Sequence, residues 1–299
     1  MSTKTHALLL VLLLFSASIL SVAQDEDAVV TVDSSLVILN ATILDKTGKN
    51  IHGLQRKQFR IFEDGAEQEI SFFAAEETPF AAVILLDTSG SMEERVSMAR
   101  SAAIRFLEGL RENDTAAIYK FDSKVSLVQK FSNTRDINEA IFDLKADGMT
   151  ALNDAIFQAA EELGKRPEKR RAIVVLSDGQ DTFSGHSASK ALKAALAANV
   201  LIYAVDMSPM SGSGSQRIQN QAALKNFAEK TGGTFLATPG GAAMRDAFKN
   251  IVDELGVQYT LGYLTTNSKK DGKWRSIELR VSRPSLTIRT RKGYNAGQQ

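Results

Sequence analysis

The chain has 299 residues, 43% of them hydrophobic, so it is long enough for one large domain or two modest ones with a sizeable core. Lysine and arginine number 36 against 35 aspartate and glutamate, and this near balance gives no overall field that would attract nucleic acid. Because there is no cysteine, disulfides, a thiol nucleophile and thiolate metal ligands are excluded.

Residues 1–23 are typical of a secretory signal peptide. Lys4 gives a positive start, residues 7–20 are apolar, and Ser21-Val22-Ala23 supplies small residues for cleavage, so we expect the mature chain to begin at Gln24. The apolar run is short for a bilayer span of about 20 residues, although an uncleaved anchor is the alternative. We therefore expect a secreted, periplasmic or cell-envelope protein with no stable membrane span after cleavage.

Residues 24–78 are predicted to form a β-rich amino-terminal arm. Its strand candidates are Leu36–Leu44, Phe59–Phe62 and Gln68–Phe73, and the last two are joined through a hairpin signal at Glu63-Asp64-Gly65. So few strands make a poor independent domain, because they cannot bury a core of their own. The arm is therefore expected to pair with another part of the chain.

From residue 79 to residue 256, buried strands alternate with amphipathic helices. The runs Ala81–Leu86 and Arg171–Ser177 are largely apolar without alternation, which indicates strands of a parallel sheet that is covered on both faces. The helix candidates Glu93–Arg111 and Ala242–Leu255 each have an apolar stripe on one face. The other candidates are strands at 115–121, 125–131, 200–205 and 234–236, and helices at 136–144, 153–163, 188–198 and 216–230. This order predicts an α/β fold with a Rossmann-like, doubly wound and mostly parallel sheet.

Residues 257–299 return to a β pattern, with strand candidates at Gln258–Leu264, Trp274–Val281 and Leu286–Thr290. We expect these strands to pair with those of the amino-terminal arm in one β-sandwich, with the α/β domain inserted between the two arms. Two separate small β units are the alternative.

Oxygen-bearing side chains follow the first buried strand, where Asp87, Ser89 and Ser91 are spaced at i, i+2 and i+4. Ligands of open α/β sheets bind outside the carboxyl ends of the strands. Carboxylate and hydroxyl oxygens, with no histidine nearby, suit a hard cation. The motif therefore predicts a site for Mg²⁺ or Mn²⁺.

This motif resembles the Asp-x-Ser-x-Ser motif of the metal-ion-dependent adhesion site in von Willebrand factor A domains. Two further parts of that site follow in the family's order, because Thr150 lies in a Gly-Met-Thr loop and Asp178 ends the second buried strand. The resemblance covers roughly residues 79–255, and together with the arms the chain is similar to exported bacterial proteins of this kind. The predicted metal site residues are Asp87, Ser89, Ser91, Thr150 and Asp178.

The resemblance implies that the hydroxyls of Ser89, Ser91 and Thr150 are metal ligands, while Asp87 and Asp178 act mostly through water or hydrogen bonds. It also implies an open coordination position that an aspartate or glutamate of a partner protein fills. We therefore expect an exported adhesion or assembly module that is not an enzyme. The resemblance further suggests that ligand binding is coupled to the last helix of the domain.

Several alternatives stay open. The metal site could only stabilise a structural component of the cell envelope, or, with less support, serve a metal-dependent hydrolase. Against a hydrolase, His52 and His186 are isolated and no Gly-x-Ser-x-Gly motif is present. Asp154, Asp181 and Asp206 are interpreted as caps or supporting groups. The Gly- and Ser-rich loop 207–215 is expected to select the partner, or else to be an inert connector.

Overall fold

The computed structural model describes residues 36–75, 78–133, 137–208, 214–237 and 241–297. The chain divides into two units, Met1–Asp33 and Ser34–Gln299, and all described residues belong to the second. The predicted signal peptide and most of the loop at 207–215 lie outside the described residues. None of the helices in the described part of the chain has the length and hydrophobicity needed to cross a bilayer.

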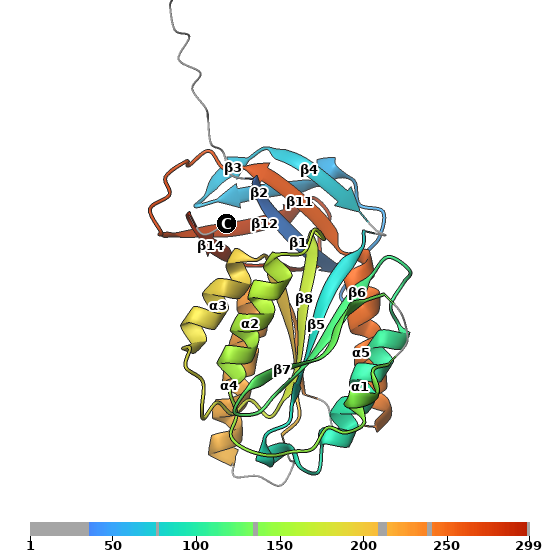
Figure 1. Cartoon of the computed structure of the whole chain (residues 1–299). Helices are drawn as coiled ribbons and strands as arrows, with labels where there is room; N and C mark the ends of the chain where they lie inside the picture. Colours follow the sequence, from blue (N-terminus) through green and yellow to red (C-terminus); the bar gives the residue numbers. More distant parts are fainter. Residues whose placement is uncertain (1–35, 76–77, 134–136, 209–213, 238–240, 298–299) are drawn as a thin grey trace, which may run out of the picture. The chain divides into compact units, whose positions relative to one another are not determined.

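The centre of the second unit is a six-stranded sheet with the order β10-β9-β8-β5-β6-β7 (Figure 1). Every neighbouring pair is parallel except β6 and β7, so the prediction of a mostly parallel sheet is confirmed. The strands are β5 (Phe80–Asp87), β6 (Thr115–Phe121), β7 (Val125–Ser132), β8 (Arg170–Ser177), β9 (Val200–Asp206) and β10 (Phe235–Ala237).

Helices cover both faces of this sheet, as the doubly wound prediction requires (Figure 1). One face packs against α1 and α5 and the other against α2, α3 and α4. All eight residues of β5 are buried, and the first seven alternate between the two cores, which explains why the strand is apolar up to Asp87. The helices are α1 (Val96–Glu108), α2 (Leu152–Gly164), α3 (Ala188–Ala197), α4 (Gly214–Thr231) and α5 (Gly241–Val257).

The two arms form one β-sandwich, which confirms that prediction. One sheet has the order β13-β1-β11-β4 and the other β14-β12-β2-β3, and both combine strands from the two ends of the chain. The alternative of two separate β units is ruled out, because β1 pairs with β11 and β2 with β12. The strands are β1 (Leu36–Leu44), β2 (Phe59–Glu63), β3 (Ala66–Gln68), β4 (Ile70–Ala75), β11 (Tyr259–Leu264), β12 (Trp274–Val281), β13 (Thr287–Arg289) and β14 (Gly293–Asn295).

Three local predictions are wrong. The helix expected at 136–144 is only a 3₁₀ turn at Glu139–Ile141, because Ile141 is the one buried residue of that turn and there is no apolar face to extend it. The single strand expected at Gln68–Phe73 is divided between the two sheets of the sandwich, since β3 ends at Gln68 and β4 begins at Ile70. The first helix begins only at Val96, after a 3₁₀ turn at Gly90–Met92.

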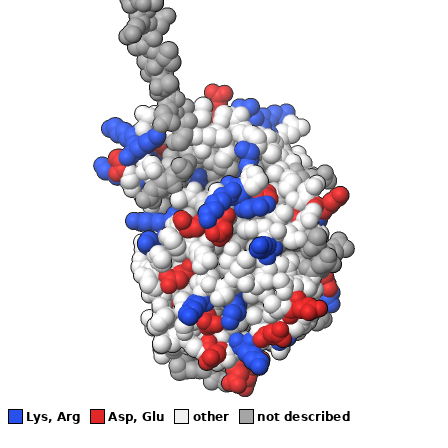
Figure 2. All heavy atoms as spheres, viewed as in Figure 1, with Lys and Arg blue, Asp and Glu red and all other residues white. Residues whose placement is uncertain are grey.

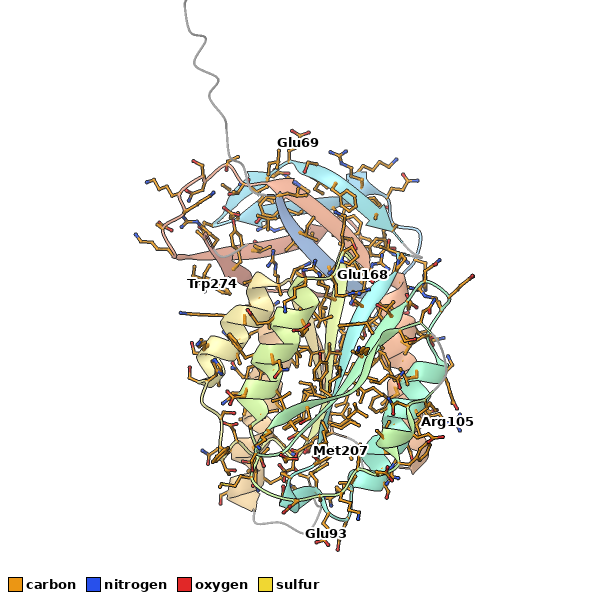
Figure 3. All side chains as sticks on the ribbon, viewed as in Figure 1. Glu69, Glu93, Arg105, Glu168, Met207 and Trp274 are labelled. Carbon is orange, nitrogen blue, oxygen red and sulfur yellow. The ribbon has the colours of Figure 1, made fainter. Side chains whose placement is uncertain are left out.

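The sandwich lies at the amino ends of β5 and β8, so the carboxyl ends of these strands point away from it (Figure 1). In Figure 3, Glu93 and Met207 lie at the end of the α/β layer that is opposite Glu69 of the sandwich. The predicted site therefore lies on the side of the α/β layer that the sandwich leaves free. Charged residues of both signs are interspersed over the face shown in Figure 2, as the near-zero net charge suggests.

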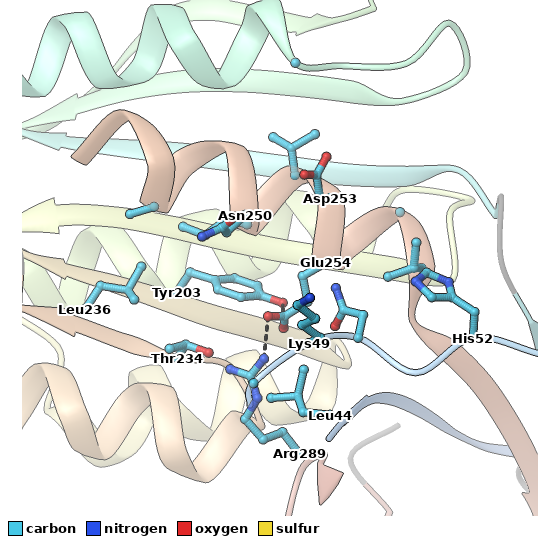
Figure 4. A pocket seen from close by; sticks show the side chains of 18 of the residues that line it. Leu44, Lys49, His52, Tyr203, Thr234, Leu236, Asn250, Asp253, Glu254 and Arg289 are labelled. Atoms are coloured by element: carbon cyan, nitrogen blue, oxygen red, sulfur yellow. Dashed lines mark hydrogen bonds and ion pairs between the residues drawn. The ribbon is translucent and has the colours of Figure 1, made fainter. Parts of the chain in front are cut away.

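A cavity of about 980 Å³ lies at the junction between the sandwich and the α/β layer (Figure 4). Glu254 of α5 is the central polar group, because its carboxylate accepts hydrogen bonds from Thr42 at 2.9 Å and Tyr203 at 2.7 Å and pairs with Arg289. Burial and the charge of Glu254 hold the pKa of Tyr203 well above its usual value, so the phenol stays a donor. None of the five predicted metal site residues lines this cavity.

The Glu254→Ala variant is expected to lose about 3 kcal/mol of unfolding free energy, since three donors from three different elements lose their acceptor in a largely buried place. Urea unfolding measures this change. Asp253→Ala is the matched control, because the neighbouring carboxylate is 53% exposed and pairs with Lys249 on the same helix; it should change stability by under about 0.5 kcal/mol. Equal losses in the two variants would show that the polar junction does not stabilise the fold.

Candidate metal centre

Asp87 is the last residue of β5, and its side chain is fully buried. One carboxylate oxygen accepts hydrogen bonds from the backbone N–H of Ser89 at 2.9 Å and from the Ser89 hydroxyl at 2.6 Å. The other oxygen accepts from the hydroxyl of Ser177 at 2.6 Å. The carboxylate is therefore held in one orientation at the edge of the sheet, between the ends of β5 and β8.

The charge of Asp87 is costly in this place. Burial raises the pKa of Asp87 from 3.8 to about 6, and the nearby carboxylate of Asp178 adds to the rise. The hydrogen bonds from Ser177 and Ser89 act in the opposite direction but do not cancel the effect of burial. A cation beside this carboxylate would relieve the unfavourable charge.

Ser89 and Ser91 lie on the tight turn that follows the strand. Ser89 is the residue before the 3₁₀ turn Gly90–Met92, and its backbone carbonyl accepts from the N–H of Met92 at 2.9 Å. The hydroxyl oxygens of Ser89 and Ser91 are 3.2 Å apart. Ser89 is buried whereas Ser91 is exposed, so the pair runs from the buried carboxylate to the surface.

The second loop, which carries Thr150, is attached to the first by its backbone. The N–H of Gly90 donates to the carbonyl of Gly148 at 3.1 Å, and the N–H of Asp147 donates to the carbonyl of Thr88 at 2.8 Å. Thr150 lies two residues after Gly148 and is 2% exposed. The Asp-x-Ser-x-Ser turn and the Thr150 loop are thus brought together as the sequence predicts.

The third loop follows β8 and carries Asp178, which is 3% exposed. The backbone N–H groups of Thr182 and Phe183 both donate to the carbonyl of Thr150, at 2.9 and 3.0 Å. One carboxylate oxygen of Asp178 accepts from the N–H of Gln180 at 3.0 Å. All three loops are therefore joined by hydrogen bonds at one edge of the sheet.

Gly179 has a strict local role beside Asp178. Its φ is +82°, which favours glycine, and a Cβ there would lie 2.5 Å from the carbonyl oxygen of Asn220 on α4. The close approach lets α4 pack directly against the loop that carries Asp178.

The donor set fits a hard cation held mainly by hydroxyls. Among the described residues there is no group of three or more histidine, cysteine, aspartate and glutamate side chains that could hold a metal ion. Ion binding at this edge would therefore depend on the hydroxyls of Ser89, Ser91 and Thr150, supported by Asp87 and Asp178. This matches the chemistry of Mg²⁺, which favours oxygen ligands and keeps several waters. That these residues bind an ion stays a prediction.

Ser177 is a site residue that sequence reasoning missed. Its hydroxyl donates to Asp87 and accepts from the N–H of Gly179 at 2.9 Å, so it links the first loop to the third. The position of Ser177 in the sequence indicates this role, because it is a hydroxyl residue directly before Asp178, at the carboxyl end of the parallel strand next to β5.

The other three carboxylates near this edge hold loops together. The carboxylate of Asp154 accepts hydrogen bonds from the ring nitrogen Nδ1 of His186 at 2.6 Å and from the backbone N–H of His186 at 2.8 Å. Asp181 accepts from the Asn153 amide at 2.6 Å, and Asp206 from the Gln221 amide at 2.6 Å. These contacts are those expected of caps and supporting groups.

Residues 82–180 match the family model described as the von Willebrand factor type A domain, and this span contains all five predicted site residues. An uncharacterized protein of Synechocystis sp. is 32% identical over 108 residues, which are 34% of this chain and 26% of that protein. Inter-alpha-trypsin inhibitor heavy chain H3 of Bos taurus is 27% identical over 134 residues, 40% of this chain and 15% of that protein. The chain thus spans about a quarter or less of these curated relatives.

Among solved structures, the vWF domain of the type V pili tip protein Mfa5 from Porphyromonas gingivalis has a TM-score of 0.50. It is 14% identical and covers 60% of this chain and 95% of its own length. At this identity the likeness concerns the fold alone, which agrees with the doubly wound sheet described above.

Proposed function

We propose that this chain, which contains a von Willebrand factor type A domain, is a protein-binding module that captures an acidic side chain through a bound divalent cation. The observation that carries the proposal is the buried carboxylate of Asp87 beside the paired hydroxyls of Ser89 and Ser91. A buried carboxylate that hydrogen-bond donors hold in one orientation is a typical property of a binding site and is unfavourable for stability alone.

The cation, Mg²⁺ or Mn²⁺, supplies positive charge that attracts a partner's carboxylate. The chain's own residues would hold it: Asp87 supplies negative charge from the buried side, the hydroxyls of Ser89 and Ser91 are ligands on the first loop, and Thr150 and Asp178 contribute from the two loops that are hydrogen-bonded to it. Hydroxyl ligands neutralise less of the ion's charge than carboxylates do, so a partner's aspartate or glutamate is bound more strongly.

A role outside the cytoplasm fits this proposal, because residues 1–23 have the pattern of a secretory signal. The solved structure with a similar fold is the vWF domain of a type V pili tip protein. We therefore propose an exported adhesion or assembly function in the cell envelope, with a protein as partner and without enzymatic activity.

The Ser89→Ala/Ser91→Ala variant tests this function. We expect the wild type to bind Mg²⁺ or Mn²⁺ in calorimetric titrations and to retain protein partners from envelope extracts in the presence of the ion but not of a chelator. The variant should lose both properties and still fold and unfold cooperatively, at a somewhat lower urea concentration than the wild type, because Ser89→Ala also removes the hydroxyl bond to the buried Asp87 carboxylate.

Ser97→Ala/Ser101→Ala is the matched control, since both serines lie on the exposed face of α1 and bond only to their own helix. It should bind the ion normally. If the Ser89/Ser91 variant fails to fold instead, the result favours the alternative in which the cation only stabilises the fold of a structural envelope component. Ion-dependent turnover of a substrate would support the alternative that the chain is a metal-dependent hydrolase.

A further inference from the structure

Large apolar side chains are exposed beside the candidate metal centre. Met149 is 50% exposed, Phe183 is 51% exposed and Ile218 is 67% exposed. We call these three residues the apolar rim. Exposed apolar side chains that gather around a polar site are a feature of protein-binding surfaces, because their burial against a partner is favourable.

Two members of the apolar rim flank Thr150. Met149 precedes it in the chain, and its backbone N–H donates to the Ser123 hydroxyl at 3.0 Å. Phe183 comes from the third loop, and its N–H donates to the carbonyl of Thr150 at 3.0 Å. Both side chains therefore stand on backbone that is fixed by hydrogen bonds, so little order would be lost on binding.

The third member comes from α4. Ile218 is two residues from Asn220, whose carbonyl lies against Gly179, the residue after Asp178. The same helix is tied to the carboxyl end of β9 by the bond from Gln221 to Asp206. Ile218 therefore belongs to the same edge of the sheet as the candidate metal centre.

The charges at this edge limit what the partner can be. Asp147 and Asp181 precede Met149 and Phe183 by two residues, and both are exposed. A partner segment with several acidic residues would meet these carboxylates and be repelled. A partner segment with a single carboxylate and apolar neighbours fits this edge better than one with several acidic residues.

We propose that the apolar rim recognises the residues on either side of the metal-bound carboxylate, so that the partner is a protein segment in which one aspartate or glutamate lies between large apolar side chains. This inference rests on the proposed function and names the class of ligand for the same site.

The experiment uses fluorescent peptides that share one Gly-Ser frame and differ only at the centre, which is Leu-Asp-Leu, Ser-Asp-Ser or Leu-Asn-Leu. Their binding to the wild type is measured by anisotropy in Mg²⁺ and in Mn²⁺, and again with chelator. We expect Leu-Asp-Leu to bind roughly tenfold more tightly than Ser-Asp-Ser, as burial of one large apolar side chain allows. Leu-Asn-Leu should not bind, since it lacks the carboxylate.

Met149→Ser, Phe183→Ser and Ile218→Ser, alone and combined, show where the preference arises. We expect the combined variant to bind Leu-Asp-Leu no better than Ser-Asp-Ser, with the affinity for Ser-Asp-Ser unchanged. Trp274→Ser is the control, because Trp274 is 43% exposed but belongs to the sandwich. It should bind all peptides as the wild type does.

The outcomes separate the inference from the function on which it rests. If the ion is not bound at all, the proposed function fails and the inference fails with it. If the ion and both aspartate peptides bind equally well, or the rim variants weaken both peptides to the same degree, only the inference is wrong. Ion binding without binding of any peptide also contradicts the apolar rim as a docking surface.

Discussion

The Asp87→Asn variant is expected to lose divalent-ion binding and yet to be as stable as the ion-free wild type, or more so, at neutral pH. The amide has the shape of the carboxylate, and its oxygen keeps both bonds from Ser89. Its NH₂ group donates to the Ser177 hydroxyl, which already accepts from Gly179. Each of the three contacts to residue 87 thus persists while the buried charge is removed, but the O–H of Ser177 no longer has the carboxylate as its acceptor.

The size of the gain follows from the pKa of Asp87. A rise from 3.8 to about 6 corresponds to about 3 kcal/mol against the charged form. Because the pKa is higher in the folded than in the unfolded protein, the folded state holds a proton between about pH 4 and pH 6 that the unfolded state releases. This group therefore lowers the unfolding free energy as pH rises through that window, and the loss is complete above it.

Urea unfolding from pH 4 to pH 8 with chelator measures this effect. The difference in unfolding free energy between Asp87→Asn and the wild type should increase with pH and level off above about pH 6. With an ion at about 100 times its dissociation constant, the wild type should gain about 2.7 kcal/mol and the variant nothing.

Asp122→Asn is the control, because Asp122 follows the neighbouring strand β6 but is paired with Lys120 at 3.3 Å. It should keep the response to the ion. A stabilising effect of Mg²⁺ or Mn²⁺ that persists in Asp87→Asn would show that the ion binds elsewhere.

The elements that could be predicted from the sequence are those in which one local pattern decides the structure. The strands Leu36–Leu44 and Trp274–Val281 have the expected bounds, the first as a mainly apolar run and the second through its alternation. The stripes on α1 and α5 are buried, because a period of 3.6 residues and the packing against the sheet agree.

The elements that could not be predicted depend on distant partners. The division between β3 and β4 follows from where Gln68 is held, since its side chain donates to Thr266 and accepts from the backbone of the same residue, 198 positions away in the chain. No local sequence pattern around Gln68 predicts this contact. In the candidate site, Asp87 and the two serines form one local motif, whereas Ser177 gains its role only through the pairing of β5 with β8.

Arg170 is the clearest example of a residue whose role is set by distant contacts, and its replacement is expected to destabilise the chain strongly. It is the first residue of β8 and has no exposed surface. Its guanidinium donates to the carbonyls of Leu255 at 3.3 Å and Gly256 at 3.0 Å, in the last turn of α5, and to that of Gln258. It also donates to the Thr260 hydroxyl at 3.1 Å.

These contacts explain why a buried arginine is tolerated here. The last carbonyls of a helix have no partner within the helix, and the guanidinium supplies several donors in a fixed geometry. Burial lowers the pKa of Arg170 to about 10, so the side chain stays charged at neutral pH. One side chain thus joins the sheet, the end of α5 and the first residues of β11 in the sandwich.

Arg170→Met is therefore expected to lower the unfolding free energy by about 3 to 5 kcal/mol, because Leu255, Gln258 and Thr260 lose donors in a place that water does not reach. The loss is limited by Arg111, which also donates to the carbonyl of Gly256 at 3.3 Å. Urea unfolding followed by both tryptophan fluorescence and circular dichroism measures it. The sole tryptophan, Trp274, reports on the sandwich, so transitions that separate between the two signals would show that the sandwich and the α/β layer have become uncoupled.

Arg105→Met controls for the loss of an arginine as such, since this side chain is 56% exposed and pairs with Glu108 on the same helix. It should change stability by under about 0.5 kcal/mol. A similarly small change in Arg170→Met would mean that methionine packs in the same space at no net cost, as happens when a buried charge is replaced by an apolar group of similar volume. In that case the sandwich would be held on the α/β layer by its other contacts, among them the bonds of Glu254 and the bond from Arg291 to the carbonyl of Leu196.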